Sequence, residues 1–375
     1  MSTEKWLDEA WNLAIHKVKT ASLRIGSQFP HGSHDGQYQL MKPDYWTAGF
    51  WPGMLWLAYR DNRDEELRRL AEECELRLDP VLYGFHELSH DTGFMWTLTA
   101  VADYTITGSS ASRDRALIAA SHLAGRFNLQ GRFIRAWNNP ERTGWAIIDC
   151  LMNLPLLYWA SAETADPRFA QIAKAHAEMA VKHLIREDGS AYHVVMFDPA
   201  TGEKEGYLGG QGYAAESAWA RGASWGLYGA ALSYQHTGDP LFLDAAERAA
   251  DFFLNHLPED LVPYWDFRLP ATDGAPRDSS ASAIAATGLL DLAALTAGGA
   301  SDRYRNGAMA ILQSLSSAAY AGGDGEEALL LHGTGNLPGN QNIDKPLIYG
   351  DYYYLEALSK LRGGSSFWAP NAWRQ

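Results

Sequence analysis

Two kinds of helical segment alternate along this chain of 375 residues, and the alternation constrains the fold more than any other feature. The spacing of apolar residues indicates about twelve helices and no long sheet. The expected helices lie at 4–25, 46–60, 64–78, 92–107, 111–126, 145–163, 167–185, 214–237, 240–256, 279–297, 302–320 and 348–361.

One kind of helix is amphipathic and charged on one face, which places it on the outside of the molecule. Most of these segments carry an Asp or Ser start signal, and in two of them Pro follows directly. The start signals are Asp64, Ser112, Asp166, Asp239 and Ser301.

The other kind of helix is nearly uncharged all round, which is typical of a helix buried on every side. These segments begin at Phe50, Gly93, Ile147, Ala223, Ser282 and Tyr352. Six buried helices that alternate with six surface helices predict an all-α protein, an (α/α)6 barrel with an inner and an outer ring. No linker or low-complexity segment divides the chain, so we expect residues 1–375 to form a single catalytic domain.

Polar residues gather at the N-terminal ends of the buried helices, which run in one direction in such a barrel and therefore meet at one mouth. Long connections lead into this mouth, whereas the returns at the other end are short. The long connections are 26–45, 127–144, 186–213, 257–277 and 321–346. Long loops over one end of a rigid scaffold commonly carry binding and catalytic residues, so we expect the site there.

Composition restricts the partners and the compartment. The net charge of −14 argues against nucleic acid as a partner, because phosphate binding needs clustered Lys and Arg. The N-terminal segment lacks the basic start and apolar centre of a signal peptide, and no segment is long enough to span a membrane. Cys74 and Cys150 fit neither a disulfide framework nor a zinc motif. We therefore expect a cytoplasmic protein with reduced thiols.

Asp149 stands alone in an apolar run from Trp145 to Pro155. A carboxyl group there loses hydration, so its neutral form is favoured and its pKa should rise. A carboxylic acid that keeps its proton near neutral pH is what general acid catalysis requires. A buried helix cap, or half of a structural ion pair, explains this stretch equally well when it is taken alone.

Asp91, preceded by His90, lies at the start of another buried helix and is the second candidate. Asp is a preferred N-cap residue, so a capping role also accounts for it. A cap at the mouth would still point its carboxylate into the cavity. Asp91 and Asp149 could divide the acid and base roles, or one of them alone could transfer protons.

Three further polar residues lie near the expected mouth. Arg221 is a cation near the start of a buried helix, and its partner could be Glu216, another carboxylate or the substrate, since an unpaired buried charge is costly. Gln211 stands among glycines, where a turn is the alternative explanation. His193 lies in a stretch that alternates like a short strand, and an ordinary loop histidine is the default there.

Aromatic side chains are unusually abundant, with 14 Trp and 18 Tyr residues. Such rings hold the apolar faces of sugars in clefts, although a large core also uses them. The candidate sugar platforms are Trp46, Trp137, Trp219 and Trp225. Core packing explains each one equally well when it is taken singly.

Six motifs follow one another in order and together cover nearly the whole chain, from about Trp46 to Leu358. They are HDTGF at 90–94, IIDCLMNLPLL at 147–157, WARGASWG at 219–226, YWDF at 264–267, RDSSASA at 277–283 and GDYYYLEAL at 350–358. This set resembles the unsaturated glucuronyl hydrolases of glycoside hydrolase family 88.

The resemblance implies an (α/α)6 barrel and a reaction that does not attack the glycosidic carbon. The family hydrates the C4=C5 double bond that a polysaccharide lyase leaves at the non-reducing end. The resulting hemiketal opens and releases a keto uronic acid and the shortened sugar. The partner would be an unsaturated di- or oligosaccharide, with no nucleic acid, no membrane, and no metal or organic cofactor implied.

The resemblance also assigns residues. Asp149 takes the acid/base position, and Asp91 takes that of the second carboxylate, which orients ring hydroxyls and steadies positive charge. The predicted substrate-binding residues are Trp46, His90, Trp137, His193, Gln211, Trp219, Arg221 and Trp225. Arg221 would supply positive charge in a pocket built for a uronate.

Two segments depart from the family pattern, the loop 324–345 and the tail 363–375. Both are expected to border the subsite of the leaving sugar. Two other functions stay open at this stage. A sugar epimerase on the same barrel would rely on paired histidines, and a non-catalytic saccharide-binding protein would use the aromatic rings; neither gives a reason for a desolvated Asp149.

Overall fold

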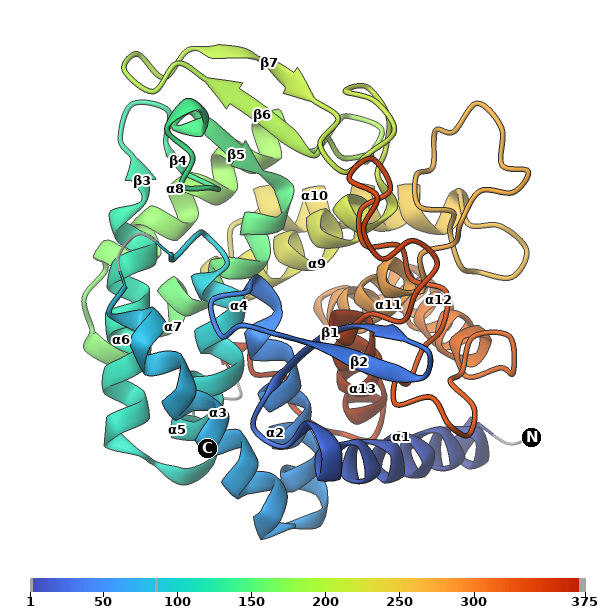
Figure 1. Ribbon diagram of the computed structural model, residues 1–375. Coiled ribbons are helices and arrows are strands. Elements are labelled where there is room, and N and C mark those ends of the chain that lie inside the picture. Colours follow the sequence, from blue (N-terminus) through green and yellow to red (C-terminus); the bar gives the residue numbers. More distant parts are fainter. Residues whose placement is uncertain (1–2, 85–86, 371–375) are drawn as a thin grey trace.

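The computed structural model describes residues 3–84 and 87–370, and helical units of an inner and an outer ring alternate along this part of the chain (Figure 1). The inner units are α2 (Phe50–Asn62), α4 (Thr92–Trp96) continued by a π-helical turn η2 (Thr97–Val101) and α5 (Ala102–Thr107), α7 (Pro155–Thr164), α9 (Ala220–Thr237), α11 (Ser279–Leu295) and α13 (Ile348–Leu361). The outer helices are α1 (Thr3–Ile25), α3 (Glu65–Leu82), α6 (Ser110–Gly125), α8 (Arg168–His183), α10 (Pro240–Asn255) and α12 (Gly298–Leu315). The predicted (α/α)6 barrel is confirmed.

The inner ring closes on itself. Helix α9 packs against α11, α11 against α13, and α13 against α2, the first inner helix. Close approach requires glycine at some of these contacts. A Cβ at Gly229 would clash with Leu151, and one at Gly288 would clash with Leu227. The nearly uncharged sequences of the inner helices therefore match their burial on all sides.

The start signals of the outer helices are confirmed in part. The side chains of Asp64 and Asp239 accept backbone N–H groups of α3 and α10 at 3.1 Å, which satisfies orphan donors of the first turn. For α6 the capping residue is Ser109 rather than Ser112. Helix α12 begins at Gly298, before the predicted start at Ser301.

Two helices begin later in the chain than the sequence predicts. The range 145–163 begins as a strand and a 3-10 helix, because β-branched and aromatic residues favour a strand and Pro155 fits the first position of α7. The range 214–237 becomes helical at Ala220 only, because the backbone at Trp219 pairs with Asp266 in an isolated bridge.

Short strands and 3-10 helices lie mainly in the long connections. The strands are β1 (Phe29–His34), β2 (Gln37–Met41), β3 (Phe127–Asn128), β4 (Phe133–Ile134), β5 (Trp145–Ile147), β6 (Val194–Phe197) and β7 (Lys204–Leu208). The 3-10 helices are η1 (Trp46–Gly49), η3 (Pro140–Arg142) and η4 (Ile148–Asn153). Antiparallel β5, β6 and β7 form one small sheet, which Figure 1 shows at the edge of the barrel near α8.

The tail expected at the sugar-binding mouth lies elsewhere. The described residues 363–370 follow the C-terminal end of α13, and Ser365 contacts Arg60 at the C-terminal end of α2. These ends of the inner helices face away from the mouth, so the prediction for 363–370 was wrong; residues 371–375 lie outside the described part. Within the described ranges, no helix is both long and apolar enough to cross a membrane.

Candidate active site

Asp149 reaches the mouth because the chain changes from strand to helix beside it. Strand β5 pairs with β6, and the backbone N–H of Ile148 then donates to the carbonyl of His193 at 3.1 Å. The 3-10 helix η4 carries Asp149 in its first turn, ahead of the inner helix α7. Asp149 thus stands at the N-terminal end of an inner helical unit, as the sequence predicts, although the helix around it is shorter.

Burial, together with the negative charge of Asp91, raises the pKa of Asp149 to about 7. The charge of Arg221 and the indole N–H of Trp225 act in the opposite direction. This N–H has no hydrogen bond of ordinary geometry to any described residue, so its interaction with Asp149 is weak. The Oδ2 atom of Asp149 likewise finds no hydrogen-bond partner within the described residues. A carboxyl group in this state can carry a proton at neutral pH.

His193 holds a defined tautomer beside Asp149. Its Nδ1 atom accepts the backbone N–H of Gln211 at 2.8 Å, so in the neutral ring the proton sits on Nε2. Burial lowers the pKa of His193 to about 3, which keeps the ring neutral. Nε2 lies 3.6 Å from Oδ2 of Asp149. Gly210, at φ +58°, lies against the His193 ring, where a Cβ would clash.

Asp91 is buried in a more polar setting. Burial raises its pKa to about 6, while a hydrogen bond from the Ser89 hydroxyl at 2.8 Å and the charge of Arg126 lower it. Asp91 occupies the N-cap position of α4, but its side chain makes no capping hydrogen bond. The Nε2 atom of His90 lies 3.5 Å from its Oδ1. The capping alternative therefore does not account for this carboxylate.

Arg221 is 2% exposed and bound by protein on several sides. Its guanidinium donates to Asp278 at 2.8 Å, to the carbonyl of Thr334 at 2.6 Å and to Oε1 of Gln211 at 2.7 Å. Its carboxylate partner is thus Asp278, whereas Glu216 accepts a hydrogen bond from Tyr192 instead. Arg221 ties together three connections of the mouth, and direct contact with a uronate stays a prediction.

The four candidate tryptophans divide into two pairs. Trp219 and Trp225 are buried, and they pack against His193 at 4.5 Å and Phe94 at 5.3 Å between ring centroids. Trp46 and Trp137 are partly exposed. Their role as sugar platforms stays a prediction for each of them.

Sequence reasoning missed several residues at this mouth. Asp278 balances the charge of Arg221, and Thr334 and Gly335 bring the divergent loop 324–345 against the same guanidinium. His31 in β1 is also buried here, and burial together with the charge of Arg221 lowers its pKa to about 4. A lone histidine in a loop-like stretch gave no periodic signal. The motif RDSSASA at 277–283 contains Asp278, but the motif alone does not indicate that Asp278 pairs with Arg221.

The described part of the chain holds no group of three or more His, Cys, Asp and Glu residues arranged to bind a metal ion. What the mouth offers is a pair of buried carboxyl groups whose pKa values are both raised toward neutrality, that of Asp149 being the higher. Environments that push two pKa values apart separate an acid from an anion. Glycoside-processing enzymes use a pair of carboxyl groups for acid and base work. A helical barrel with such a pair at its mouth belongs to this class.

Known proteins agree with this class. The sequence profile of Glycosyl Hydrolase Family 88 matches residues 22–360. An unsaturated glucuronyl hydrolase of Bacillus sp. (strain GL1) is 40% identical over 357 residues, which cover 92% of this chain and 94% of that protein. An unsaturated chondroitin disaccharide hydrolase of Streptococcus pyogenes serotype M1 is 37% identical, and the match covers 94% of this chain and 90% of that protein.

A solved structure supports the same relationship at the level of the fold. It is an unsaturated glucuronyl hydrolase bound to dGlcA-Glc-Rha-Glc, with a TM-score of 0.93 and 38% sequence identity, covering 96% of this chain and 98% of that one. The chain belongs to glycosyl hydrolase family 88.

Proposed function

We propose that Asp149 is the proton donor and Asp91 the charge-stabilising carboxylate of an unsaturated glucuronyl hydrolase. As a member of family 88, the chain is a hydrolase that acts on unsaturated uronyl oligosaccharides. The observation that supports the roles is the pair of buried carboxyl groups with pKa values of about 7 and about 6. The group with the higher pKa is the one that keeps the proton.

The reaction starts from a sugar whose C4=C5 bond is conjugated to the ring oxygen. Asp149 transfers its proton to C4, and the positive charge that develops at C5 and the ring oxygen is stabilised by nearby carboxylates. Water then adds to C5 and returns a proton to Asp149, which restores the starting enzyme. The C5 hemiketal opens to a ketone, and the C1 hemiacetal that remains expels the shortened sugar.

The neighbours of Asp149 suit this sequence of steps. The Nε2 atom of neutral His193 lies 3.6 Å from the carboxyl group without a hydrogen bond to it, so its N–H is available to a bound substrate. Gln211 is fixed between His193 and Arg221 by its backbone and side chain. We propose that these residues, with His90 and the four tryptophans named above, line the uronate subsite.

The test follows the ultraviolet absorbance of the alkene during incubation with a lyase-generated unsaturated disaccharide. We expect the absorbance to fall and, in heavy water, deuterium to appear at C4 of the product. The matched saturated glucuronide should not be cleaved, because it has no alkene to protonate. Rapid cleavage of the saturated sugar would contradict hydration, and binding without loss of absorbance would support a saccharide-binding protein.

We also propose that residues 1–375 act as one catalytic domain in the cytoplasm. Closure of the inner ring by α13 on α2 supports the first statement, and two buried free cysteines, Cys74 and Cys150, support the second. A stable proteolytic fragment that keeps activity would contradict the single domain. Recovery of the native protein outside the cytoplasmic fraction would contradict the location.

A further inference from the structure

The C-terminal segment closes the barrel at the end opposite to the active site. After α13 ends at Leu361, the chain turns back through Gly363, at φ +87°. Phe367 and Trp368 then enter the interior, where their side chains are 1% and 0% exposed. A tail that only covered the surface would not bury two large rings, so this segment is part of the core.

Trp368 is fixed by a set of buried hydrogen bonds. Its indole N–H donates to Oε2 of Glu356 at 3.2 Å, and its backbone N–H donates to the Ser366 hydroxyl at 3.1 Å. Its carbonyl accepts from Nε2 of His236 at 2.9 Å. Ser366 in turn donates to Glu356, which also accepts from Tyr228 at 3.1 Å. These partners hold the indole in one orientation.

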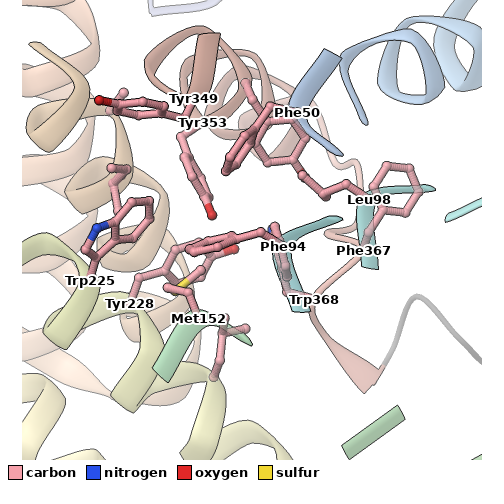
Figure 2. Close-up of a cluster of buried hydrophobic side chains, with 14 of the residues drawn as sticks. Phe50, Phe94, Leu98, Met152, Trp225, Tyr228, Tyr349, Tyr353, Phe367 and Trp368 are labelled. Atoms are coloured by element: carbon pink, nitrogen blue, oxygen red, sulfur yellow. The ribbon is translucent and has the colours of Figure 1, made fainter. Parts of the chain in front are cut away.

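Two aromatic rings connect Trp368 with Trp225, as Figure 2 shows. Phe94 lies 6.0 Å from Trp368 and 5.3 Å from Trp225 between ring centroids. Tyr353 stacks on Trp368 at 6.3 Å and meets Trp225 edge-on at 5.5 Å. Cores of this density transmit a change at one ring to its neighbours.

The residues that carry two of these rings are also linked to both acidic residues. Phe94 follows Asp91 by three positions in α4, and its backbone N–H donates to the side chain of Asn153 at 2.6 Å. Asn153 belongs to η4, the 3-10 helix that carries Asp149. On the other side, the indole of Trp225 is close enough to Asp149 to lower the pKa of its carboxyl group, without a hydrogen bond of ordinary geometry.

We propose that Trp368 is a positioning residue for the hydration reaction, acting through Phe94, Tyr353 and Trp225 to fix Asp149 relative to Asp91. This inference rests on the proposed role of Asp149 as the acid. Trp368 itself is too deep to meet a substrate that enters from the mouth. A misplacement of about 1 Å at a reacting group can cost ~10²-fold in rate, so a support two rings away is sufficient to matter.

The experiment replaces Trp368 by Phe and by Leu and uses Trp56→Leu as the matched control. Trp56 is also fully buried, in α2, but its ring contact is with Tyr59. Both Leu variants lose a similar volume of buried ring, but Trp368→Leu also removes the N–H that Glu356 accepts and should lose more stability, so kcat is compared on the folded fraction of each variant. We expect kcat to fall about 10-fold in Trp368→Leu at nearly unchanged KM, and to keep its wild-type value in Trp56→Leu.

The pH profile separates positioning from stability. The Trp225 N–H lowers the pKa of Asp149, so loosening Trp225 should move the alkaline limb of kcat to higher pH in Trp368→Leu. Trp368→Phe should give an intermediate loss and a shift in the same direction, and it serves as the test if the Leu variant does not fold. If the folded Trp368 variants keep the wild-type kcat and the alkaline limb stays at the wild-type pH, the inference is overturned. Asp149→Asn, measured in parallel, shows separately whether Asp149 is the acid.

Discussion

Asp149 and Asp351 both lie in the first turn of a helical unit at the mouth, and burial raises the pKa of each to about 7. Their hydrogen bonds differ. Asp351 accepts the N–H groups of Leu329 at 2.6 Å and Leu330 at 2.9 Å, and also the hydroxyl of Tyr38. Asp149 leaves Oδ2 without a partner among the described residues.

The contrast shows which property marks a catalytic acid. A raised pKa reports burial, and both residues have it. Buried polar atoms in native proteins are nearly always hydrogen-bonded, so an exception needs an explanation. The donors around Asp351 join the loop at 328–331 and β2 to α13, which is a structural task. The free oxygen of Asp149, beside a second carboxylate, is available to a substrate.

The largest effect is expected from Asp149→Asn. The variant keeps the shape of the side chain but removes the proton donor, so kcat should fall about 10²–10⁴-fold with binding of the unsaturated disaccharide largely kept. Alkene absorbance measures the rate, and titration calorimetry measures binding. A variant that retains most of the wild-type rate would show that Asp149 is not the acid.

Stability of the same variant gives an internal check. The folded pKa of Asp149, about 7, lies above the ordinary value of 3.8, so the folded state binds more protons than the unfolded state between these pH values. Ionisation of Asp149 therefore lowers the free energy of unfolding progressively as pH rises through this window, and the whole loss is present above about pH 7. Asp149→Asn should raise the Tm relative to wild type more at alkaline than at acidic pH.

Asp351→Asn should produce the opposite pattern. An amide NH2 placed against backbone N–H donors leaves buried groups unpaired, so unfolding free energy should drop by roughly 1–3 kcal/mol. The folded fraction should keep kcat within about twofold, because Asp351 is tied into the protein rather than free for substrate. Urea unfolding and active-site-normalised kinetics measure the two quantities. A large loss of kcat in fully folded Asp351→Asn would remove the distinction between the two carboxyl groups.

The smallest effect concerns the pH dependence of the wild-type enzyme. Asp91 must be ionised and Asp149 protonated, so kcat should rise through a pKa of about 6 and fall through one of about 7. Because the two carboxyl groups interact, each limb reports an apparent pKa of the pair rather than the pKa of one residue. Asp91→Asn should weaken the acidic limb and, because the charge of Asp91 raises the pKa of Asp149, move the alkaline limb to lower pH. A rate independent of pH across the neutral range would contradict both assignments.

Much of the fold could be read from the sequence. Charged faces and uncharged helices separate the two rings because burial of an unpaired charge is costly, and this rule acts locally along the chain. The start of an element is decided less locally. Trp145–Ile147 becomes a strand because β6 offers hydrogen-bond partners, and β6 lies about 50 residues further on in the chain.

The sequence by itself determined the alternating barrel, the mouth at which the polar helix ends meet, and Asp149 as a desolvated carboxyl group. Tertiary structure decided the partners. It pairs Arg221 with Asp278 and places the tail with Trp368 at the far end of the barrel. It also supplies hydrogen-bond donors to Asp351, whereas Oδ2 of Asp149 has no partner among the described residues. The physical reason is that a residue's own neighbours set its tendency to be buried, whereas hydrogen-bond partners come from segments that only folding brings together.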